Sequence, residues 1–544
     1  MKQYKLMLLI AITSMACSKR ETVDLIVTNA QIYSVDSAFN IYSCMAISNG
    51  KIVELNSHGT IFSKYKPKNV VDAGEKFIYP GFIDAHCHFL GYGLNLSTAS
   101  LSGAKSWNEV VERLVNHQKQ YPSDWVQGRG WNQNEWDIKR FPTNKLLNVA
   151  FPDKPVYIVR IDGHTAIANQ KALELAGVTG DTSIEGGEIV KSGGKVTGVL
   201  IDNAMELVRK HIPKPSAPEK TQALLSAQAS CFSVGLTGIH DAGLDTDEVL
   251  LIDSLQKQGM LNIRVNAMLN PTKSNFGRFV GKGIHQTERL TVRSVKIYAD
   301  GALGSRGALL LKPYSDDPQN KGIQVTPTET LDSICRMANN AGYQVCTHCI
   351  GDAAVRLMLG IYSGYLAEGN DKRWRIEHSQ VVDPQDMSRY GQYKVIPSVQ
   401  TTHATSDMEW ADERLGSRIK YAYAYQDLLK QNGWLPNGSD FPIENINPLY
   451  GFYAGVARKN LNGEPRNGFQ PENALTREQA LRAMTIWAAK SCFEENVKGS
   501  LEPGKVADFV ILDYDLINDS IQLIPGVKVY QTYVNGEKVY DLNQ

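Results

Sequence analysis

The middle of the chain alternates short apolar runs with longer stretches of helical pattern. Such alternation is typical of a parallel sheet whose strands are joined by helices. The predicted strands are Gly81–His88, Leu236–Asp241, Asn262–Leu269, Ser294–Ala299, Tyr343–His348, Arg373–His378, Val395–Gln400 and Leu435–Asp440. Eight strands is the number that a (β/α)₈ barrel of the TIM type requires, so we predict this α/β fold for residues 79–497.

Both ends of the chain predict short β-strands instead. In each end an Asn-Gly pair, Asn49-Gly50 or Asn535-Gly536, separates two apolar runs, which is a strong signal for a β-hairpin. Either end alone has too few strands for a stable core. We therefore predict one small β-sandwich built jointly from residues 22–78 and 498–544.

A long interval of about 150 residues separates the first two predicted barrel strands, far more than one crossover helix needs. The interval contains a strand of its own, Pro155–Ile161, and several Gly-rich turns. We predict an inserted subdomain over about residues 100–215. The helical run Ala217–Ser233 then leads back to the barrel.

The first 17 residues have the pattern of a secretory signal. Lys2 and Lys5 precede the apolar run Leu6–Ile12, and small residues lead to Cys17. This order, with a cysteine at the cleavage point, resembles a bacterial lipoprotein signal in which Cys17 is lipidated. A plain signal peptide or a short membrane anchor are the alternatives. We expect an exported protein, periplasmic or attached to the outer membrane, that touches the membrane only through the N-terminal lipid.

Composition excludes several classes of function. The 544 residues carry 57 Lys+Arg and 57 Asp+Glu, so no net charge attracts nucleic acid, and no nucleic-acid partner is expected. The eight cysteines form neither a disulfide framework nor a paired CxxC zinc site. Cys87, Cys346 and Cys349, which lie near the histidines described next, are interpreted as small buried residues.

Histidines and charged residues stand near the ends of the predicted barrel strands. His86 and His88 end the first strand, and their spacing of two directs both imidazoles to the same side. The other members of this set are Lys296 in the fourth strand, His348 and His378 at the ends of the fifth and sixth, and Asp440 at the end of the eighth. Catalytic groups of TIM barrels gather at these strand ends. Imidazoles with a carboxylate suit Zn²⁺, and Mn²⁺, Fe²⁺ or Co²⁺ are the alternatives.

The motifs around these residues resemble a known family over about residues 24–540. The matching stretches are Phe82-Ile-Asp-Ala-His-Cys-His88, Asp162-Gly-His164, Gly235–Gly243, Val295–Ser305, His348-Cys-Ile-Gly-Asp352, Arg375-Ile-Glu-His378, Ser398–His403, Gly438-Ser-Asp440 and Gly499–Asp508. In this order they are similar to the amidohydrolase superfamily, specifically amidohydrolase family 3. In that superfamily the terminal segments pair into a small β-sandwich beside the barrel.

The resemblance implies a set of metal ligands. His86 and His88 would bind one metal ion, and His348 and His378 a second. Lys296 matches a lysine that many members carboxylate, and its carbamate would bridge two metal ions. The alternative is an unmodified lysine beside a single metal ion, with His348 and His378 holding the oxyanion. Asp440 matches an aspartate that binds metal and acts as general base and then general acid on a metal-activated water.

Four further residues are candidates for substrate contacts. His164 and His403 match residues that line the substrate pocket of the family. Asp300 follows the strand of Lys296 and either binds substrate or holds a loop, and Trp131 is a candidate wall of the pocket contributed by the insert. The implied activity is hydrolysis of a C–N bond in a small-molecule amide, N-formyl amine or N-acyl amine.

Other functions remain open from the residues alone. The same site suits a metal-dependent ester or lactone hydrolase or an isomerase, because a fold does not determine the reaction. A non-catalytic binding lipoprotein on the cell surface is another class. All six expected ligand positions are filled, which favours an enzyme. Homo-oligomerisation is not decided by the sequence.

Overall fold

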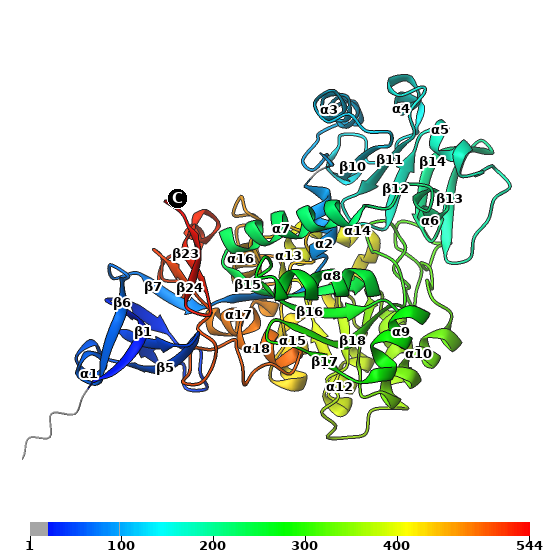
Figure 1. Cartoon of the computed structure of the whole chain (residues 1–544). Helices are drawn as coiled ribbons and strands as arrows, with labels where there is room; N and C mark the ends of the chain where they lie inside the picture. Colours follow the sequence, from blue (N-terminus) through cyan, green and yellow to red (C-terminus); the bar gives the residue numbers. More distant parts are fainter. Residues whose placement is uncertain (1–19, 97, 544) are drawn as a thin grey trace, which may run out of the picture.

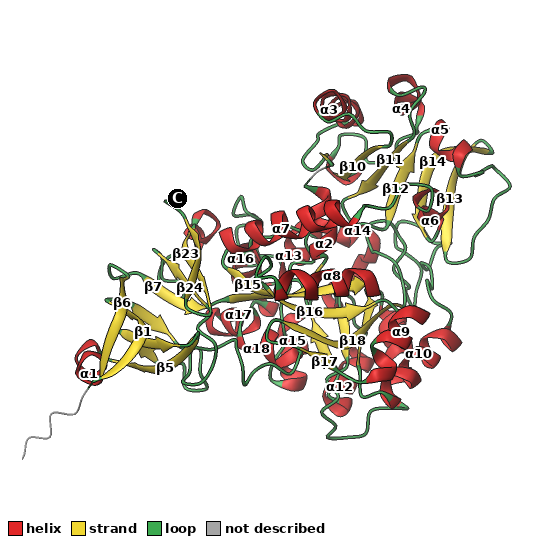
Figure 2. Cartoon of the chain, viewed as in Figure 1, coloured by secondary structure: helices red, strands yellow, loops and turns green. Residues whose placement is uncertain are grey.

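The computed structural model describes residues 20–96 and 98–543. The predicted signal with Cys17 lies outside the described residues. Figure 1 shows a central barrel with the terminal strands on one side of it and the sheet formed by residues 99–202 on the other. Figure 2 shows that helices surround the strands of the central part. Across the described part of the chain, no helix combines the length and apolarity needed to cross a bilayer.

Seven parallel strands form the barrel wall. Their spatial order follows the chain, with the last predicted strand missing: β8 (Phe82–Cys87), β15 (Leu236–Leu244), β16 (Arg264–Leu269), β18 (Leu290–Tyr298), β19 (Gln344–Cys349), β20 (Arg375–His378) and β21 (Ile396–Ser398). A short strand, β17 (His285–Gln286), pairs antiparallel with β18 outside this order. Runs of fully buried residues in β16, β19 and β20 are typical of parallel strands covered on both faces.

The predicted eighth strand, over residues 435–440, is not a regular strand. Pro436 has no N–H to donate to a ladder, and Asp440 adopts a positive φ of 60°. The segment nevertheless bonds to both neighbours. The Gly438 N–H donates to the Val399 carbonyl at 3.0 Å, and the Asp440 N–H donates to the His86 carbonyl at 2.7 Å. It thereby bridges the last and first strands, which gives a nearly closed barrel of the TIM type.

Helices follow the barrel strands and cover them. They are α2 (Phe89–Asn95), α7 (Ala217–Ser233), α8 (Thr246–Lys257), α9 (Lys273–Arg278), α10 (Thr328–Asn340), α11 (Asp352–Ser363), α12 (Pro384–Tyr393), α13 (Thr401–Asp407), α14 (Ala411–Leu415), α15 (Tyr425–Asn432), α16 (Pro448–Ala457), α17 (Arg477–Ala483) and α18 (Ile486–Ser491). Pro218 and a complete capping box between Ser216 and Glu219 start α7, as the sequence pattern Ser-x-x-Glu favours.

Residues between β8 and β15 form a second sheet. Its strands are β9 (Ala99–Ser100), β10 (Val126–Trp131), β11 (Val156–Arg160), β12 (Thr165–Ala168), β13 (Gly187–Ser192) and β14 (Lys195–Asp202), with helices α3 (Trp107–Gln120), α4 (Lys145–Ala150), α5 (Gln170–Leu175) and α6 (Ala204–Arg209). Two apolar clusters of its own lie in this segment. We call residues 99–209 the insert.

The two chain ends share a sheet. Strand β22 (Phe509–Leu512) pairs antiparallel with β7 (Phe77–Pro80), and the full order also includes β2 (Gln31–Tyr33), β3 (Ile41–Tyr42), β23 (Val529–Val534) and β24 (Glu537–Asp541). A four-stranded sheet beside it contains β1 (Glu21–Thr28), β4 (Cys44–Ser48), β5 (Lys51–Asn56) and β6 (Tyr65–Asp72), and α1 (His58–Lys64) connects two of these strands. Both Asn-Gly pairs have positive φ, as a tight hairpin turn requires.

Candidate metal centre and substrate pocket

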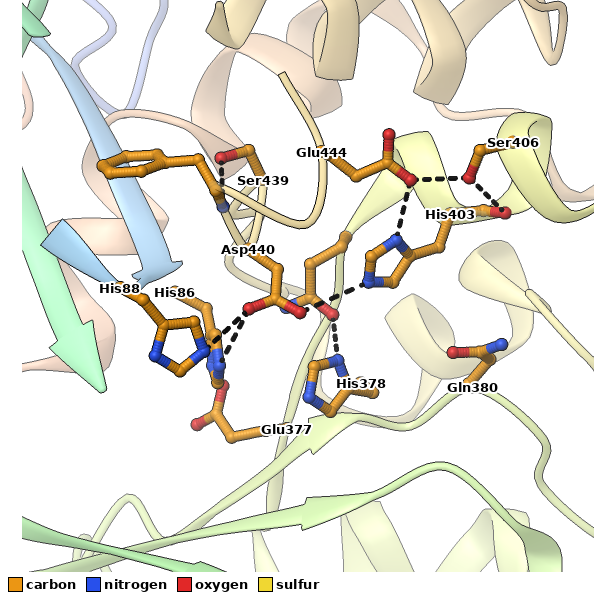
Figure 3. A network of polar contacts seen from close by, with 12 residues as sticks. His86, His88, Glu377, His378, Gln380, His403, Ser406, Ser439, Asp440 and Glu444 are labelled. Carbon is orange, nitrogen blue, oxygen red and sulfur yellow. Dashed lines mark hydrogen bonds and ion pairs between the residues drawn. The ribbon is translucent and has the colours of Figure 1, made fainter. Parts of the chain in front are cut away.

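The predicted histidines and Asp440 converge at the carboxyl ends of the barrel strands. His86 lies near the end of β8, His88 directly precedes α2, His348 lies in β19 and His378 ends β20. Figure 3 shows His86, His88 and His403 directed toward the Asp440 carboxylate. Strand order and the bridging segment of residues 435–440 therefore bring together residues that are up to 354 positions apart in the sequence.

His86 is oriented by a buried carboxylate. Its Nδ1 lies 2.5 Å from Oε2 of Glu377, and Glu377 in turn lies 2.6 Å from Nε of Arg375. All three side chains are fully buried. The Nε2 atom of His86 lies 3.6 Å from Oδ1 of Asp440 and 3.1 Å from Nζ of Lys296. Glu377 therefore holds the ring with Nε2 directed at the other site residues.

Four of the other imidazoles around the site are held in the same way. Each Nδ1 lies against an acceptor: the Ala242 carbonyl for His88 at 3.0 Å, Gln400 Oε1 for His378 at 2.7 Å, Glu444 Oε1 for His403 at 3.0 Å and Asp202 Oδ1 for His164 at 2.7 Å. His403 has a raised pKa that keeps both of its ring nitrogens protonated. In a neutral imidazole such as that of His378, an acceptor at Nδ1 places the hydrogen on that nitrogen and leaves the lone pair on Nε2. This is the arrangement that metal-binding histidines require.

The Asp440 carboxylate lies between two sets of imidazoles. Oδ1 is 3.2 Å from His88 Nε2, and Oδ2 is 3.6 Å from His403 Nε2. Candidate ligand atoms lie within 4.8 Å of one another in two groups that share Asp440, one with His86 and His88 and one with His378 and His403. His403 therefore lies beside the predicted ligands His378 and Asp440.

Two buried atoms at this point have no hydrogen-bond partner among the described residues. They are Oδ1 of Asp440 and Nε2 of His348. Burying an acceptor without a partner is costly, whereas an acceptor lone pair is what a cation needs. These two atoms and the inward Nε2 lone pairs fit a divalent metal ion bound by nitrogen and oxygen ligands.

Electrostatics of the site keep Asp440 ionised and two histidines neutral. Burial raises the pKa of Asp440, but the nearby imidazoles of His403 and His88 outweigh it and hold that pKa well below its usual range. Burial lowers the pKa values of His348 and His378 far below normal. Burial also opposes protonation of His403, yet Asp440 and Glu444 raise its pKa to about 10.

Lys296 lies on the barrel interior, as predicted. Its side chain is fully buried, and Nζ lies 3.1 Å from His86 Nε2 and 5.0 Å from the ring centroid of Tyr298. Burial lowers the pKa of its ammonium group. Cys87, Cys346 and Cys349 are also buried, and burial raises the pKa of each thiol.

A cavity of about 630 Å³ opens over the site. His164, His348, His378, His403 and Asp440 line its floor and sides. The insert contributes Arg129, Gly130, Asn132, Arg160 and Asp162, and apolar contacts come from Leu96, Leu303, Ile350, Trp410 and Ile446. This volume and its mixed lining are typical of pockets for small molecules.

Two of the predicted substrate contacts are placed elsewhere. Trp131 does not line the cavity: its indole is fully buried in the apolar cluster of the insert. It packs edge-on against Trp107 and tilted against Trp136, and Nε1 donates to the Ile158 carbonyl at 3.3 Å. The pairing of β10 with β11 is irregular between Arg129 and Trp131, and Gly130 between them has a positive φ of 106°. Arg129 and Gly130 therefore both line the cavity while Trp131 faces the core. The prediction for Trp131 was wrong.

Asp300 holds a loop. It is fully buried and accepts backbone N–H groups from Leu309, Ile350 and Gly351 at 2.8–3.0 Å. Of the two roles predicted for Asp300, the structure therefore supports the loop-holding one. His164 and His403, in contrast, do line the cavity.

Sequence reasoning missed the acceptors that orient the imidazoles: Glu377, Gln400, Glu444 and Asp202. Only Glu377 left a signal. Arg375 and Glu377 stand two apart in an otherwise buried strand, so both side chains face the barrel interior, where charges occur only as partners. The other three lie in loops or at strand ends whose positions depend on tertiary contacts.

A nearly closed TIM-type barrel with imidazoles and a carboxylate at its strand ends defines the class of metal-dependent hydrolases. A family model described as amidohydrolase family matches residues 69–540. The chain belongs to this family.

Individual relatives match almost the whole chain. Protein LONG AFTER FAR-RED 3 of Arabidopsis thaliana is 33% identical (95% of this chain, 91% of the relative), and the putative amidohydrolase YtcJ of Bacillus subtilis is 30% identical (91% and 95%). N-substituted formamide deformylase of Arthrobacter pascens is 25% identical (95% and 98%). Among solved structures, an uncharacterized metal-dependent hydrolase from Pyrococcus horikoshii is 30% identical with a TM-score of 0.75, covering 91% of this chain and 99% of that chain.

Proposed function

We propose that this protein hydrolyses the C–N bond of a small N-formyl or N-acyl amine with the help of a bound metal ion. The observation that carries the proposal is the convergence of inward-facing Nε2 atoms on the ionised Asp440 beneath the cavity. Similarity to a relative named N-substituted formamide deformylase supports the choice of an amide bond.

The residues that would hold the metal are His86, His88, His348, His378 and Asp440, with Zn²⁺ as the preferred ion. Lys296, if carboxylated by CO₂, would supply a further anionic ligand to the metal. When bound, the metal lowers the pKa of a coordinated water and polarises the substrate carbonyl.

The chain's own residues move the proton. Asp440 is ionised and has an unpartnered oxygen, so it accepts a proton from the attacking water and then donates it to the leaving nitrogen. His403, held between Asp440 and Glu444, keeps that carboxylate oriented. His164, held by Asp202, is placed to donate a hydrogen bond to the substrate from the insert side of the cavity.

The test is metal analysis followed by a substrate panel. Residues 18–544 would be purified after zinc and bicarbonate supplementation, and metal per chain measured by elemental analysis. One or two equivalents, with hydrolysis of formamides or amides that a chelator abolishes, is the expected result. A folded protein with no bound metal would overturn the proposal, as would a loaded protein that cleaves only lactones or esters.

A further inference from the structure

Two arginines of the insert line the same wall of the cavity, on neighbouring parallel strands. They are Arg129 on β10 and Arg160 on β11. The guanidinium of Arg160 is fully engaged. Its Nε donates to Gln133 at 2.8 Å, Nη1 to Asp162 at 2.7 Å and Nη2 to Asn132 at 2.7 Å. Arg160 therefore stabilises the insert wall itself.

Arg129 has no such partners. Its one hydrogen bond among the described residues runs from Nη2 to the Ile161 carbonyl at 3.3 Å, and its buried Nε has no acceptor. No carboxylate of the described residues forms an ion pair with Arg129. A guanidinium with five N–H groups that is largely removed from water and has one weak contact is costly to keep.

The carboxylates that share the cavity with Arg129 have other partners. Asp162 binds Arg160, Glu444 binds His403 and Ser406, Asp407 accepts from Gln380 and Tyr423, and Glu135 accepts from Asn132. Asp440 faces the imidazoles of His86, His88 and His403. Among the described residues none of these carboxylates forms an ion pair with Arg129, so its unpartnered Nε can bind an anion from outside the chain.

The backbone leaves room for the guanidinium at this place. A side chain on Gly163, which has a positive φ of 74°, would place its Cβ 3.2 Å from Nη2 of Arg129. The missing side chain keeps the guanidinium against the backbone, beside the cavity. Its planar arrangement of N–H groups matches the two oxygens of a carboxylate.

We infer that Arg129 binds a carboxylate carried by the substrate, so that the substrates are N-formyl or N-acyl amino acids rather than simple amides. This rests on the proposed function, since the scissile amide is placed at Asp440. The apolar contacts at Leu303, Ile350 and Trp410 would receive an apolar amino-acid side chain.

The test uses two substrates that differ only in the carboxylate: N-formyl-leucine, in both enantiomers, and N-isopentylformamide. We expect zinc-loaded wild type to prefer one enantiomer of N-formyl-leucine in kcat/KM. Arg129→Met should lower kcat/KM for it by about 10- to 150-fold, the value of a hydrogen bond to a charged group, and lower kcat/KM for N-isopentylformamide by much less. Arg129→Lys keeps the charge but not the paired N–H groups. Its kcat/KM for N-formyl-leucine should lie between the values of wild type and Arg129→Met.

Arg113→Met is the matched control, because Arg113 lies on α3 of the same insert, pairs with the partly exposed Glu109 and does not line the cavity. Arg113→Met should have the wild-type kcat/KM for both substrates. Equal wild-type activity on the two substrates would overturn the inference. An equal loss on both in Arg129→Met would do the same, since it indicates a structural role.

Binding separates this inference from the proposed function. If neither formamide is hydrolysed, the proposed function fails, and calorimetric titration of the zinc-loaded protein with N-formyl-leucine still tests Arg129. Binding that Arg129→Met abolishes and Arg113→Met preserves would support the carboxylate site. Failure of wild type to bind N-formyl-leucine would overturn it.

Discussion

His86 and Glu377 are 291 positions apart in the sequence, yet Nδ1 of the histidine lies 2.5 Å from Oε2 of the glutamate in the barrel interior. Arg375 completes this buried group, donating from Nη2 to Glu377 at 2.9 Å and to the Ala85 carbonyl at 2.6 Å. Burial opposes ionisation, but Arg375 and His86 hold the pKa of Glu377 well below its usual range. The carboxylate therefore stays charged and determines which nitrogen of His86 faces the site.

Glu377→Gln should weaken metal binding. An amide is a weaker acceptor for the His86 N–H, and losing such an orienting partner typically costs about 10- to 100-fold in metal affinity. The variant should also unfold more easily by about 3–5 kcal/mol, because it leaves the Arg375 charge buried and unpaired. Competition with a chelator measures the first effect and denaturant titration the second.

Glu206→Gln is the control for that variant. Glu206 also pairs with an arginine, Arg209, but at the protein surface, so its loss should change stability by no more than about 1 kcal/mol and metal affinity not at all. Wild-type metal affinity in Glu377→Gln would contradict the orienting role.

Asp440→Asn should retain most of the bound metal, since the imidazoles remain. Turnover should fall by about 10²- to 10⁴-fold because the amide cannot accept the proton. Elemental analysis and steady-state kinetics on the same preparation separate the two quantities. Near-normal turnover would remove the assigned role of Asp440.

Lys296→Met should reduce the metal content from two equivalents to one. Methionine fills the buried space but cannot form a carbamate ligand. Wild type grown with ¹³C-bicarbonate should show a carbamate signal by ¹³C NMR that the variant lacks, and a short carboxylate such as propionate should restore part of the activity. Two equivalents of metal in the variant would exclude a carbamate bridge.

Gly301→Ala should disturb the contact between the insert and the barrel. An added Cβ would lie 2.6 Å from Oδ2 of Asp202, the residue that holds His164. Overpacking at this place should cost about 1–3 kcal/mol in unfolding free energy and raise KM, because His164 loses its orientation.

Gly360→Ala provides the comparison for Gly301→Ala. Gly360 lies within α11 and has open space around an added Cβ, so alanine there should stabilise the protein by up to about 1 kcal/mol. If Gly301→Ala matched this gain in stability and kept the wild-type KM, the contact would have no role.

Cys17→Ser should change where the protein is found. In a bacterial host the wild-type chain should incorporate radiolabelled palmitate and sediment with membranes after a high-salt wash, since its attachment is covalent. The serine variant should lack the label and appear in the soluble fraction. An unlabelled, salt-extractable wild type would contradict lipidation.

Much of the barrel was predictable because strand positions depend on local patterns. Seven predicted strands coincide with β8, β15, β16, β18, β19, β20 and β21 within a few residues. The prediction of the eighth strand was wrong, since apolar content alone does not reveal that Pro436 and the positive φ of Asp440 interrupt the hydrogen-bond ladder. The prediction that Trp131 lines the pocket was wrong for a related reason, because a tryptophan near a predicted pocket packs equally well on the core face of its strand.

The sequence by itself determined the kind of chemistry, because histidines and an aspartate at strand ends must meet wherever parallel strands close into a barrel. Only the tertiary structure decided which nitrogen of each imidazole faces inward. Those orientations depend on Glu377, Gln400, Glu444 and Asp202, which come from distant segments. The structure also decided that Arg160 makes three short side-chain hydrogen bonds, whereas Arg129 makes one longer bond to a backbone carbonyl. A hydrogen bond acts over about 3 Å, and no pattern along the chain specifies distances of that size between remote residues.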